Sequence, residues 1–439
     1  MILARQIRVT LGALAASGKL SVRPDTSEDM WGRAEQLEIG TDGLEGFLRC
    51  TRTIGVTAEF ENVIHTFRPA PGVIPADFRP ELCCGTDGCA LVDLKRDISY
   101  GENGRKRPTR VLYSADSANP YEVAPIKDFI ANLTCNPAII YDSFINNPKA
   151  NRNQQFKNRQ EVMQELCRIL GPGVDISVEV DNPFASREAI LEEIAEFQEI
   201  LTPYRLVVKV PHTGPLTADN ASQLVAGTFR QGFEDGTVDS NFYGHNLAYF
   251  LEQHGYRTNF TLMFEPHQAA LALQVKPYFI NTFIKQRYLV TDTIRTLLAR
   301  WHATGDTHYI TAVRDMLRQE DVISAAEAEG PIEAVIQKAE AMLAYRHAGD
   351  AEGSDGLDAT RHSLRVLRNS NLPDTRLIIC SMSGEHIYPA IDKMLMEPEF
   401  EDMLHRVVVT APPSYLARFA SASGVLTYQK LFLNAAGKR

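Results

Sequence analysis

Short runs of apolar, often β-branched residues recur along the chain from about residue 109. Eight of them predict strands: 109–116, 131–137, 174–181, 205–211, 256–264, 276–283, 375–383 and 405–413. Stretches with helical apolar spacing lie at 160–171, 186–201 and 413–424. Strands that alternate with helices indicate βα units, and eight units predict a closed (β/α)8 TIM barrel. An open doubly wound sheet is the alternative, but no glycine-rich dinucleotide fingerprint follows the first run.

Residues 1–108 do not share this pattern. They contain irregular, proline-rich stretches, and the polar segment Ser99–Arg110 that follows is interpreted as a linker. The first twenty residues predict a helix and not a signal peptide, because basic residues interrupt their apolar positions. We therefore expect an N-terminal extension of unknown role (1–108) and a barrel (109–439).

Two connections within the barrel region are long. Residues 215–256 separate the fourth and fifth predicted strands and include a polar stretch, and residues from about 286 to 374 separate the sixth and seventh. The second contains several helical patterns, which predict a helical insertion. Long connections in a compact domain are usually lids, interfaces or disordered segments. Since the first directly follows the fourth strand, we expect it to form a lid over the catalytic mouth.

Composition limits the function classes. The 439 residues are 44% hydrophobic and 23% charged, as in a soluble globular protein. The formal net charge of −10 argues against nucleic-acid binding, and no apolar run is long enough for a membrane span. Seven cysteines without a signal peptide favour reduced thiols in the cytoplasm. Cys83, Cys84 and Cys89 lack a second ligand pair at a familiar spacing, so we expect no metal site.

Lys209 is the most informative residue, because it lies in the middle of the apolar run Leu206–Val210. Lysine is almost never fully buried unless it is paired. Side chains alternate across a strand, so Lys209 faces the barrel interior if Val208 and Val210 face the helices. Polar residues occur at similar places in the other strands, namely Asp116, Asn136, Glu179, Asn259 and Thr261.

Each of these polar residues also has an ordinary structural interpretation. Asp116 is a candidate helix cap, Asn136 a turn residue, and Glu179 a buried ion-pair partner of Lys209. Inward polar groups on five successive strands would be a costly set of burials without a function. Catalytic groups of barrels come from the carboxyl ends of several strands, which favours a functional interpretation. His212, His267 and His386 are interpreted as structural or surface residues.

Four segments, LTCNPAIIYDSF, ISVEVD, VVKVPHT and TNFTLMFEPHQA, carry a family resemblance. In this order they resemble motifs of the transaldolases and of their shorter fructose-6-phosphate aldolase-like relatives, with Cys135 in place of a threonine. The resemblance extends from about Arg110 to the C-terminus. That family forms a (β/α)8 barrel and transfers a three-carbon dihydroxyacetone unit from a ketose to an aldehyde, without a metal or organic cofactor.

The resemblance implies a role for each candidate. Lys209 would form the Schiff base, with its pKa lowered by burial. Asp116 would be the acid/base of C–C cleavage, and Glu179 and Thr261 would manage a catalytic water. Asn136, Asn259, Ser381 and Ser383 would bind substrate. The predicted partners are small sugars of carbohydrate metabolism, and the sequence leaves room for a homo-oligomer.

The sequence departs from the family where sugar phosphates bind. Asn281 and Ser383 stand where the resemblance leads us to expect arginines. An unphosphorylated or otherwise modified ketose is therefore predicted, unless Lys276, Lys285 or Arg287 supplies the missing charge. Two other functions stay open: a class I aldolase that cleaves or forms the bond without transfer, and a non-catalytic barrel with a binding or regulatory role.

Overall fold

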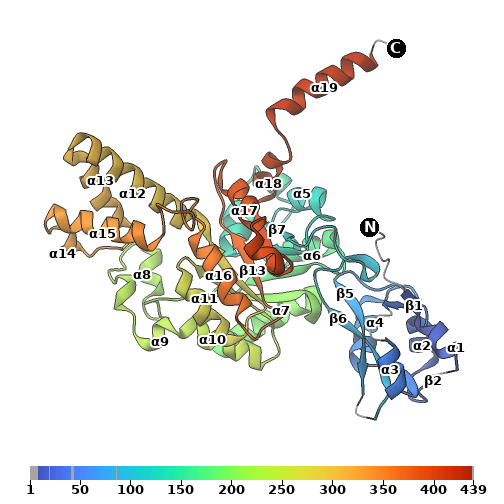
Figure 1. Cartoon of the computed structure of the whole chain (residues 1–439). Helices are drawn as coiled ribbons and strands as arrows, with labels where there is room; N and C mark the ends of the chain where they lie inside the picture. The colour runs from blue at the N-terminus through green and yellow to red at the C-terminus, as the bar shows by residue number, and fades with distance from the viewer. Residues whose placement is uncertain (1–7, 19, 41–43, 86, 438–439) are drawn as a thin grey trace.

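The computed structural model describes residues 8–18, 20–40, 44–85 and 87–437. Eight parallel strands close into a barrel in chain order, and the last pairs with the first (Figure 1). They are β7 (Leu112–Asp116), β8 (Asn132–Thr134), β9 (Asp175–Glu179), β10 (Leu206–Pro211), β11 (Thr258–Met263), β12 (Phe279–Phe283), β13 (Arg376–Cys380) and β14 (Val407–Ala411). The predicted (β/α)8 barrel is confirmed, and each strand falls within one of the eight apolar runs.

Helices cover the outside of the barrel. The main ones are α6 (Arg159–Leu170), α7 (Arg187–Arg205), α10 (Tyr243–Gln253), α11 (Pro266–Ala272), α12 (Ile284–Thr304), α16 (Asp358–Arg368), α17 (Ile387–Leu395) and α18 (Pro413–Phe419). Outward strand residues such as Val178, Val208 and Val210 are buried in the same apolar cluster as these helices. Inward residues such as Val207 and Phe279 belong to a separate, smaller cluster. The alternation of apolar positions therefore leaves a defined interior for the polar residues.

Residues 8–104 form a compact unit, called here the N-terminal module. Its elements are β1 (Arg8–Thr10), α1 (Leu11–Ala16), β2 (Ser21–Val22), α2 (Glu28–Ala34), β3 (Glu38–Gly40), α3 (Leu44–Cys50), β4 (Thr53–Val56), α4 (Ala58–Phe67), β5 (Phe78–Cys84), β6 (Ala90–Arg96) and η1 (Glu102–Gly104). β2, β4, β6 and β5 form a four-stranded sheet, and β1 pairs with β3. The module has its own apolar cluster, which includes Ile54, Phe60 and Phe78. The sequence-based interpretation of this region as irregular is wrong.

The helix predicted for the first twenty residues is correct only in part. Arg8–Thr10 is a strand, and the helix is Leu11–Ala16; residues 1–7 lie outside the described chain. The hydroxyl of Thr10 accepts a hydrogen bond from the backbone N–H of Ala13, which caps the helix at its start. Arg8–Thr10 thus pairs with β3 and does not extend the helix.

The module docks against the amino ends of the barrel strands. Arg96, at the end of β6, lies 2.5 Å from the buried carboxylate of Asp175, the first residue of β9. Arg257, just before β11, bonds to the same carboxylate at 3.1 Å. Arg376, the first residue of β13, donates to Asp97 at 2.8 Å. Catalytic groups of barrels lie at the opposite, carboxyl ends, so the module does not cover the candidate site.

The segment Ser99–Arg110 is anchored and does not behave as a free linker. Arg107 donates to the buried carboxylate of Asp77 at 2.7 Å and to the carbonyl of Ile98 at 3.0 Å. Tyr100 and Lys106 form an isolated antiparallel bridge. The polar side chains of this segment predicted a linker, but several of them form hydrogen bonds within the structure. These hydrogen bonds hold the segment in place between the module and the barrel.

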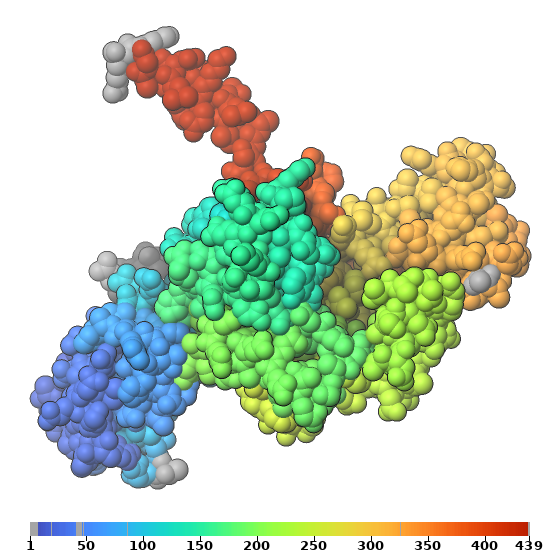
Figure 2. All heavy atoms as spheres, turned by 180° about the vertical axis from the view of Figure 1, so that it is seen from behind, coloured from blue at the N-terminus to red at the C-terminus, as the bar shows by residue number. Residues whose placement is uncertain are grey.

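The two long connections are both largely helical. Residues 215–256 contain α8 (Ala221–Val225), η5 (Phe233–Asp235), α9 (Val238–Asn241) and α10. The connection between β12 and β13 contains α12, α13 (Thr307–Gln319), α14 (Ala325–Ala328), α15 (Ile332–Tyr345) and α16, which confirms the helical insertion. α12, α13 and α15 project as a lobe with its own apolar cluster (Figures 1 and 2). α8 lies beside this lobe in both views.

The C-terminal helix α19 (Ser423–Ala436) extends away from the barrel (Figure 1). The predicted helix at 413–424 ends earlier, at Phe419, and α19 was not predicted. Its exposed apolar side chains are Val425, Leu426, Tyr428, Leu431, Phe432 and Leu433. Among the described residues, no helix has the length and apolar character required to cross a membrane.

Candidate active site

Lys209 and Glu179 form the centre of the site. They are register partners on β10 and β9, and Nζ of Lys209 lies 3.4 Å from Oε2 of Glu179. Lys209 is 5% exposed, so it is buried and paired. Glu179 is the last residue of its strand, which places the pair at the carboxyl end of the barrel. The predicted inward direction of Lys209 agrees with this geometry.

The pKa of Lys209, and with it the protonation state of the amine, differs from the sequence-based prediction. Burial alone lowers its pKa, but Glu179 and Asp116 act in the opposite direction, and the net pKa lies above the ordinary value. The prediction of a lowered pKa is therefore wrong for this state, because it considered burial without the two nearby carboxylates. Lys209 rests as an ammonium group and must lose a proton before it can act as a nucleophile.

Asp116 is the last residue of β7, and it interacts electrostatically with Lys209. Burial raises the pKa of Asp116 above its ordinary value, and the positive charge of Lys209 only partly compensates. A carboxyl group with a raised pKa accepts a proton more readily. Asp116 is therefore placed, and electrostatically suited, to exchange protons beside the lysine.

β11 contributes Asn259 and Thr261, which are both buried. Asn259 is the register partner of Lys209, and the hydroxyl of Thr261 accepts from the side-chain amide of Asn281 on β12 at 3.3 Å. Neither side-chain polar atom of Asn259, nor the amide oxygen of Asn281, has a hydrogen-bond partner among the described residues. Buried polar atoms normally have a partner, so these atoms are available for a substrate or water.

The backbone is irregular where β11 and β13 end. The pairing of β11 with β12 shifts between Phe260 and Met263, and Leu262 has a φ of +65°. Ser381, directly after β13, has a φ of +58°. Such conformations are strained for residues other than glycine and often occur at functional sites. Here they redirect the chain just beyond Thr261 and Cys380.

The other predicted binding residues, Asn136, Ser381 and Ser383, lie at the same end of the barrel. They have fewer described contacts with the other site residues. The side-chain oxygen of Asn136 accepts from the backbone N–H of Ile139 at 2.9 Å, so it has a structural role in the turn after β8. The carbonyl of Ser381 accepts from the backbone N–H of Lys285 at 2.8 Å. Ser383 is partly buried two residues further on. The described contacts do not join these residues directly to Lys209.

Two cysteines lie near the site; Cys135 was named from the sequence without a role in the site, and Cys380 was not singled out. Cys380 lies in the apolar cluster of the barrel interior, and its thiol interacts electrostatically with Asp116 and Lys209. Cys135 interacts with the same two charges, and burial raises its pKa to about 12. Burial also raises the pKa of Cys380, so both thiols stay neutral. Alternation from Ile378 would have placed Cys380 inside the barrel.

The histidines agree with a structural or surface interpretation. His212 lies at the end of β10, where its ring packs 4.5 Å from Phe260 and 5.1 Å from His245. Burial lowers the pKa of His212 to about 3, so it is neutral at pH 7. His267 and His386 are exposed.

The three cations considered as replacements for a phosphate-binding arginine differ in whether another residue already neutralises them. Arg287 is bound by Asp358 at 2.6 Å and by Glu265 at 2.5 Å, so its charge is already neutralised. Lys276 precedes β12, at the end of the barrel opposite the site, and lies 3.7 Å from Glu252. Lys285 is exposed in the first turn of α12, directly after β12. Only Lys285 of these three is both near the site and without a described ion pair.

In the part of the chain that the structure describes, no three His, Cys, Asp or Glu residues form a group that could hold a metal ion. Cys83 and Cys84 are exposed and Cys89 is buried, all with free thiols. The functional groups of the candidate site are a lysine, carboxylates, amides and a hydroxyl.

One comparison with known proteins matches part of the chain to a family model. The search of curated proteins found no match. The crystal structure of monooxygenase RslO1 from Streptomyces bottropensis is 10% identical, covering 69% of this chain and 92% of that chain, but its TM-score of 0.30 supports no structural argument. The family model described as Transaldolase/Fructose-6-phosphate aldolase matches residues 113–313, slightly less than half of the chain. This region contains Asp116, Glu179, Lys209 and Thr261 and supports an aldolase-type Schiff-base enzyme at the family level. The predicted resemblance is thus confirmed at the level of a family-model match: residues 113–313 match the transaldolase/fructose-6-phosphate aldolase family.

Proposed function

We propose that the protein is a transaldolase-like transferase that moves a three-carbon ketol unit from a ketose donor to an aldehyde acceptor. The observation that carries this proposal is the buried Lys209, 3.4 Å from Glu179 at the carboxyl end of the barrel. An amine in this setting is suited to form a covalent Schiff base with a ketone carbonyl. The family match supports the same class of chemistry.

The reaction starts with loss of a proton from Lys209, for which Glu179 is the nearest described acceptor. The neutral amine attacks the ketose carbonyl, and the resulting carbinolamine loses water with a proton supplied through Glu179 and a water held by Thr261. The iminium then withdraws electrons while Asp116 takes the proton from the C4 hydroxyl, and the C3–C4 bond breaks. The bound enamine attacks the acceptor aldehyde. Return of a proton and hydrolysis release the product.

The remaining site residues bind and orient the donor. Asn259 supports this role because both of its side-chain polar atoms are buried without a described partner. Asn136 can still offer its amide group, since only its oxygen is used in the turn. We assign Ser381 and Ser383 to the substrate side of the mouth. Residues 215–256 are proposed as the lid, because they follow β10, the strand that carries Lys209, and because the hydroxyl of Thr213 donates to the carbonyl of Ser240 at 2.7 Å.

Two alternatives follow from the same fold. If water reaches the enamine before an acceptor does, the protein is a class I aldolase without transfer. If no covalent intermediate forms, the barrel serves a binding or regulatory role, in which the N-terminal module and the insertion would be the interaction surfaces.

We further propose that the protein acts in the cytoplasm without a metal or organic cofactor. The division into 1–108 and 109–439 is retained as a proposal.

Trapping the intermediate tests the proposed function. Borohydride reduction in the presence of a ketose donor should attach the three-carbon unit to Lys209, detectable by peptide mass spectrometry. A panel of phosphorylated and free ketoses, read out in this way, also identifies the donor. Absence of an adduct with every donor, or an adduct on another lysine, would contradict the proposal and favour the non-catalytic barrel.

The substrate prediction concerns the phosphate group. Because Arg287 is neutralised and Asn281 faces Thr261, we propose an unphosphorylated or modified ketose as donor. We expect kcat/KM for fructose 6-phosphate to exceed that for fructose by less than about 100-fold, since a bidentate charged clamp of about 2–4 kcal/mol is absent. A larger preference, lost in Lys285→Ala, would show that Lys285 binds the phosphate.

We also propose that the protein self-associates. The exposed apolar side chains of α19 favour burial against another surface, because large exposed apolar patches usually mark interaction sites. This proposal is separate from the catalytic one, and light scattering of the full chain measures it directly.

A further inference from the structure

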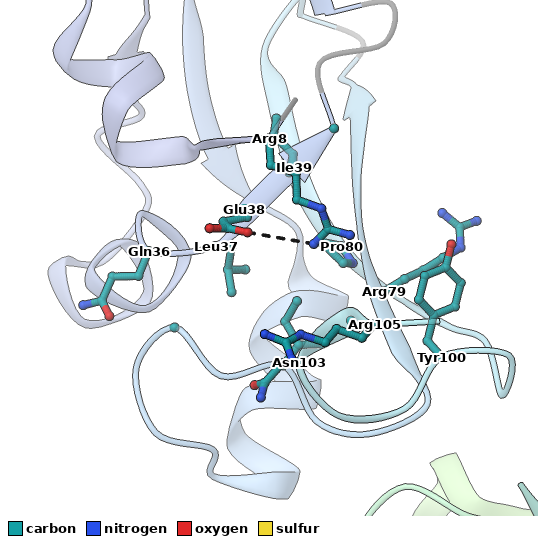
Figure 3. Close-up of a pocket in the computed structure, with 14 residues that line it drawn as sticks. Arg8, Gln36, Leu37, Glu38, Ile39, Arg79, Pro80, Tyr100, Asn103 and Arg105 are labelled. Carbon is teal, nitrogen blue, oxygen red and sulfur yellow. Dashed lines mark ion pairs between the residues drawn. The ribbon is translucent and has the colours of Figure 1, made fainter. Parts of the chain in front are cut away.

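A polar cavity lies in the N-terminal module, far from the residues assigned to catalysis. Its volume is about 390 Å³, within the range of small-molecule sites. It is enclosed by β1, β3, the start of β5 and the segment around η1 (Figure 3). Its polar lining includes the side chains of Arg8, Gln36, Glu38, Arg79, Asn103 and Arg105.

The cavity is rich in positive charge, although the whole chain carries a net charge of −10. Three arginines line it against one glutamate. Arg79 already contacts two carboxylates, Glu81 at 3.3 Å and Asp97 at 3.5 Å, whereas Arg8 has a long contact with the exposed Glu38, at 3.9 Å. Arg105 is exposed, and its guanidinium has no ion pair or hydrogen bond among the described residues. Arg8 and Arg105 are therefore the cations available to a ligand.

The arginines come from different elements and surround the same hollow. Arg8 reaches in from β1 and Arg105 from the chain after η1, while Arg79 and Tyr100 lie together on another side (Figure 3). Guanidinium groups on two sides of a hollow can bind one tetrahedral anion through several charge-assisted hydrogen bonds. The amides of Gln36 and Asn103 add neutral donors and acceptors suited to hydroxyl groups.

Two glycines allow the walls of the cavity to approach each other. Gly104 has a φ of +60°, and a Cβ there would lie 3.0 Å from Ile74 and 3.2 Å from Pro80. Gly72 has a φ of +74°, and a Cβ there would lie 2.8 Å from the side-chain oxygen of Gln36. Both positions favour glycine for conformation and for space. Part of the wall of the hollow is thus glycine backbone packed directly against neighbouring side chains.

We propose that this cavity binds a small molecule that carries a phosphate ester, at a site separate from the barrel mouth. The charge and volume of the cavity fit one phosphate group with a short polyhydroxylated body. The site also contacts the barrel: Asp97, next to Arg79, accepts from Arg376 at the start of β13. A ligand held by Arg8 and Arg105 would therefore lie beside Arg79, whose partner Asp97 takes part in the junction between module and barrel. The proposal does not depend on the catalytic function.

Binding to the full chain tests the site directly. Isothermal titration with fructose 6-phosphate, inorganic phosphate and fructose should show saturable binding of the phosphate ester at the module, and any binding of fructose at the barrel mouth should be the same in Arg105→Ala and in the wild type. Arg105→Ala should weaken binding about 10- to 100-fold, as for the loss of a charged hydrogen bond. Arg52→Ala removes an exposed arginine of the same module outside the cavity lining and should leave the affinity unchanged. Unchanged melting temperatures would exclude misfolding of either variant.

The outcomes are distinct. Equal binding of inorganic phosphate and the ester, both weakened by Arg105→Ala, supports the site and assigns free phosphate as its ligand. Lack of saturable binding by both phosphate compounds overturns the proposal, as does an affinity that Arg105→Ala leaves unchanged. Binding lost in Lys285→Ala but retained in Arg105→Ala would place the anion at the barrel mouth and also overturn it. Failure to trap a Lys209 adduct affects the catalytic proposal alone.

Discussion

Lys209→Ala should lower kcat for ketol transfer by about 10⁴-fold or more, the scale on which loss of a covalent nucleophile acts. The amine is the only group proposed to bond to the donor, and neither Glu179 nor Asp116 can replace it as an electron sink. Removal of the ammonium leaves Glu179 without its partner at 3.4 Å, but this carboxylate is partly exposed. We therefore expect the fold to persist. Steady-state kinetics, together with circular dichroism, measure both effects.

Lys276→Ala is the matched control, because it removes a lysine at the opposite end of the barrel. It should leave kcat unchanged. An independent readout is the pH profile of the wild type: kcat/KM should rise with pH into the alkaline range, since the pKa of Lys209 lies above its ordinary value. Turnover retained by Lys209→Ala would assign the chemistry to another group.

The barrel could be predicted from sequence because its signal is local and repeated. Each strand is a short apolar run, and the alternation within β10 was sufficient to direct Lys209 inward. The same alternation identified Glu179, Asn259 and Thr261 as interior residues. The protonation of Lys209 could not be predicted in this way, because it depends on distances to carboxylates from two other strands.

The N-terminal module was missed for a related physical reason. β2 has only two residues, and the sheet order β2–β4–β6–β5 is set by pairings between segments distant in sequence. The neutralisation of Arg287 was equally hidden, since Asp358 lies 71 residues later, beyond most of the insertion. Short strands and long-range ion pairs leave little periodic signal, whereas a regular βα alternation leaves a strong one.

The second prediction with a large expected effect concerns stability at the junction of the module and the barrel. Asp175→Ala should lower the free energy of unfolding by about 3–5 kcal/mol, the usual cost of removing one partner from a buried ion pair. Asp175 is fully buried and is bound by Arg96 at 2.5 Å and by Arg257 at 3.1 Å. Its loss leaves two largely buried guanidinium groups without their shared counterion. Urea denaturation followed through Trp31 in the module measures this change.

The carboxylate of Asp175 also determines how this contribution to stability changes with pH. Burial alone raises the pKa of Asp175, but Arg257 and Arg96 lower it below its ordinary value. Its charge therefore stabilises the wild type fully above the unfolded-state pKa of about 3.9, and this contribution is lost as the pH falls through the lower folded-state pKa. Asp374→Ala is the control, since this exposed carboxylate lies 4.0 Å from Lys95 at the same junction and should cost about 1 kcal/mol or less. Equal destabilisation by the two variants would show that the buried cluster does not hold the module against the barrel.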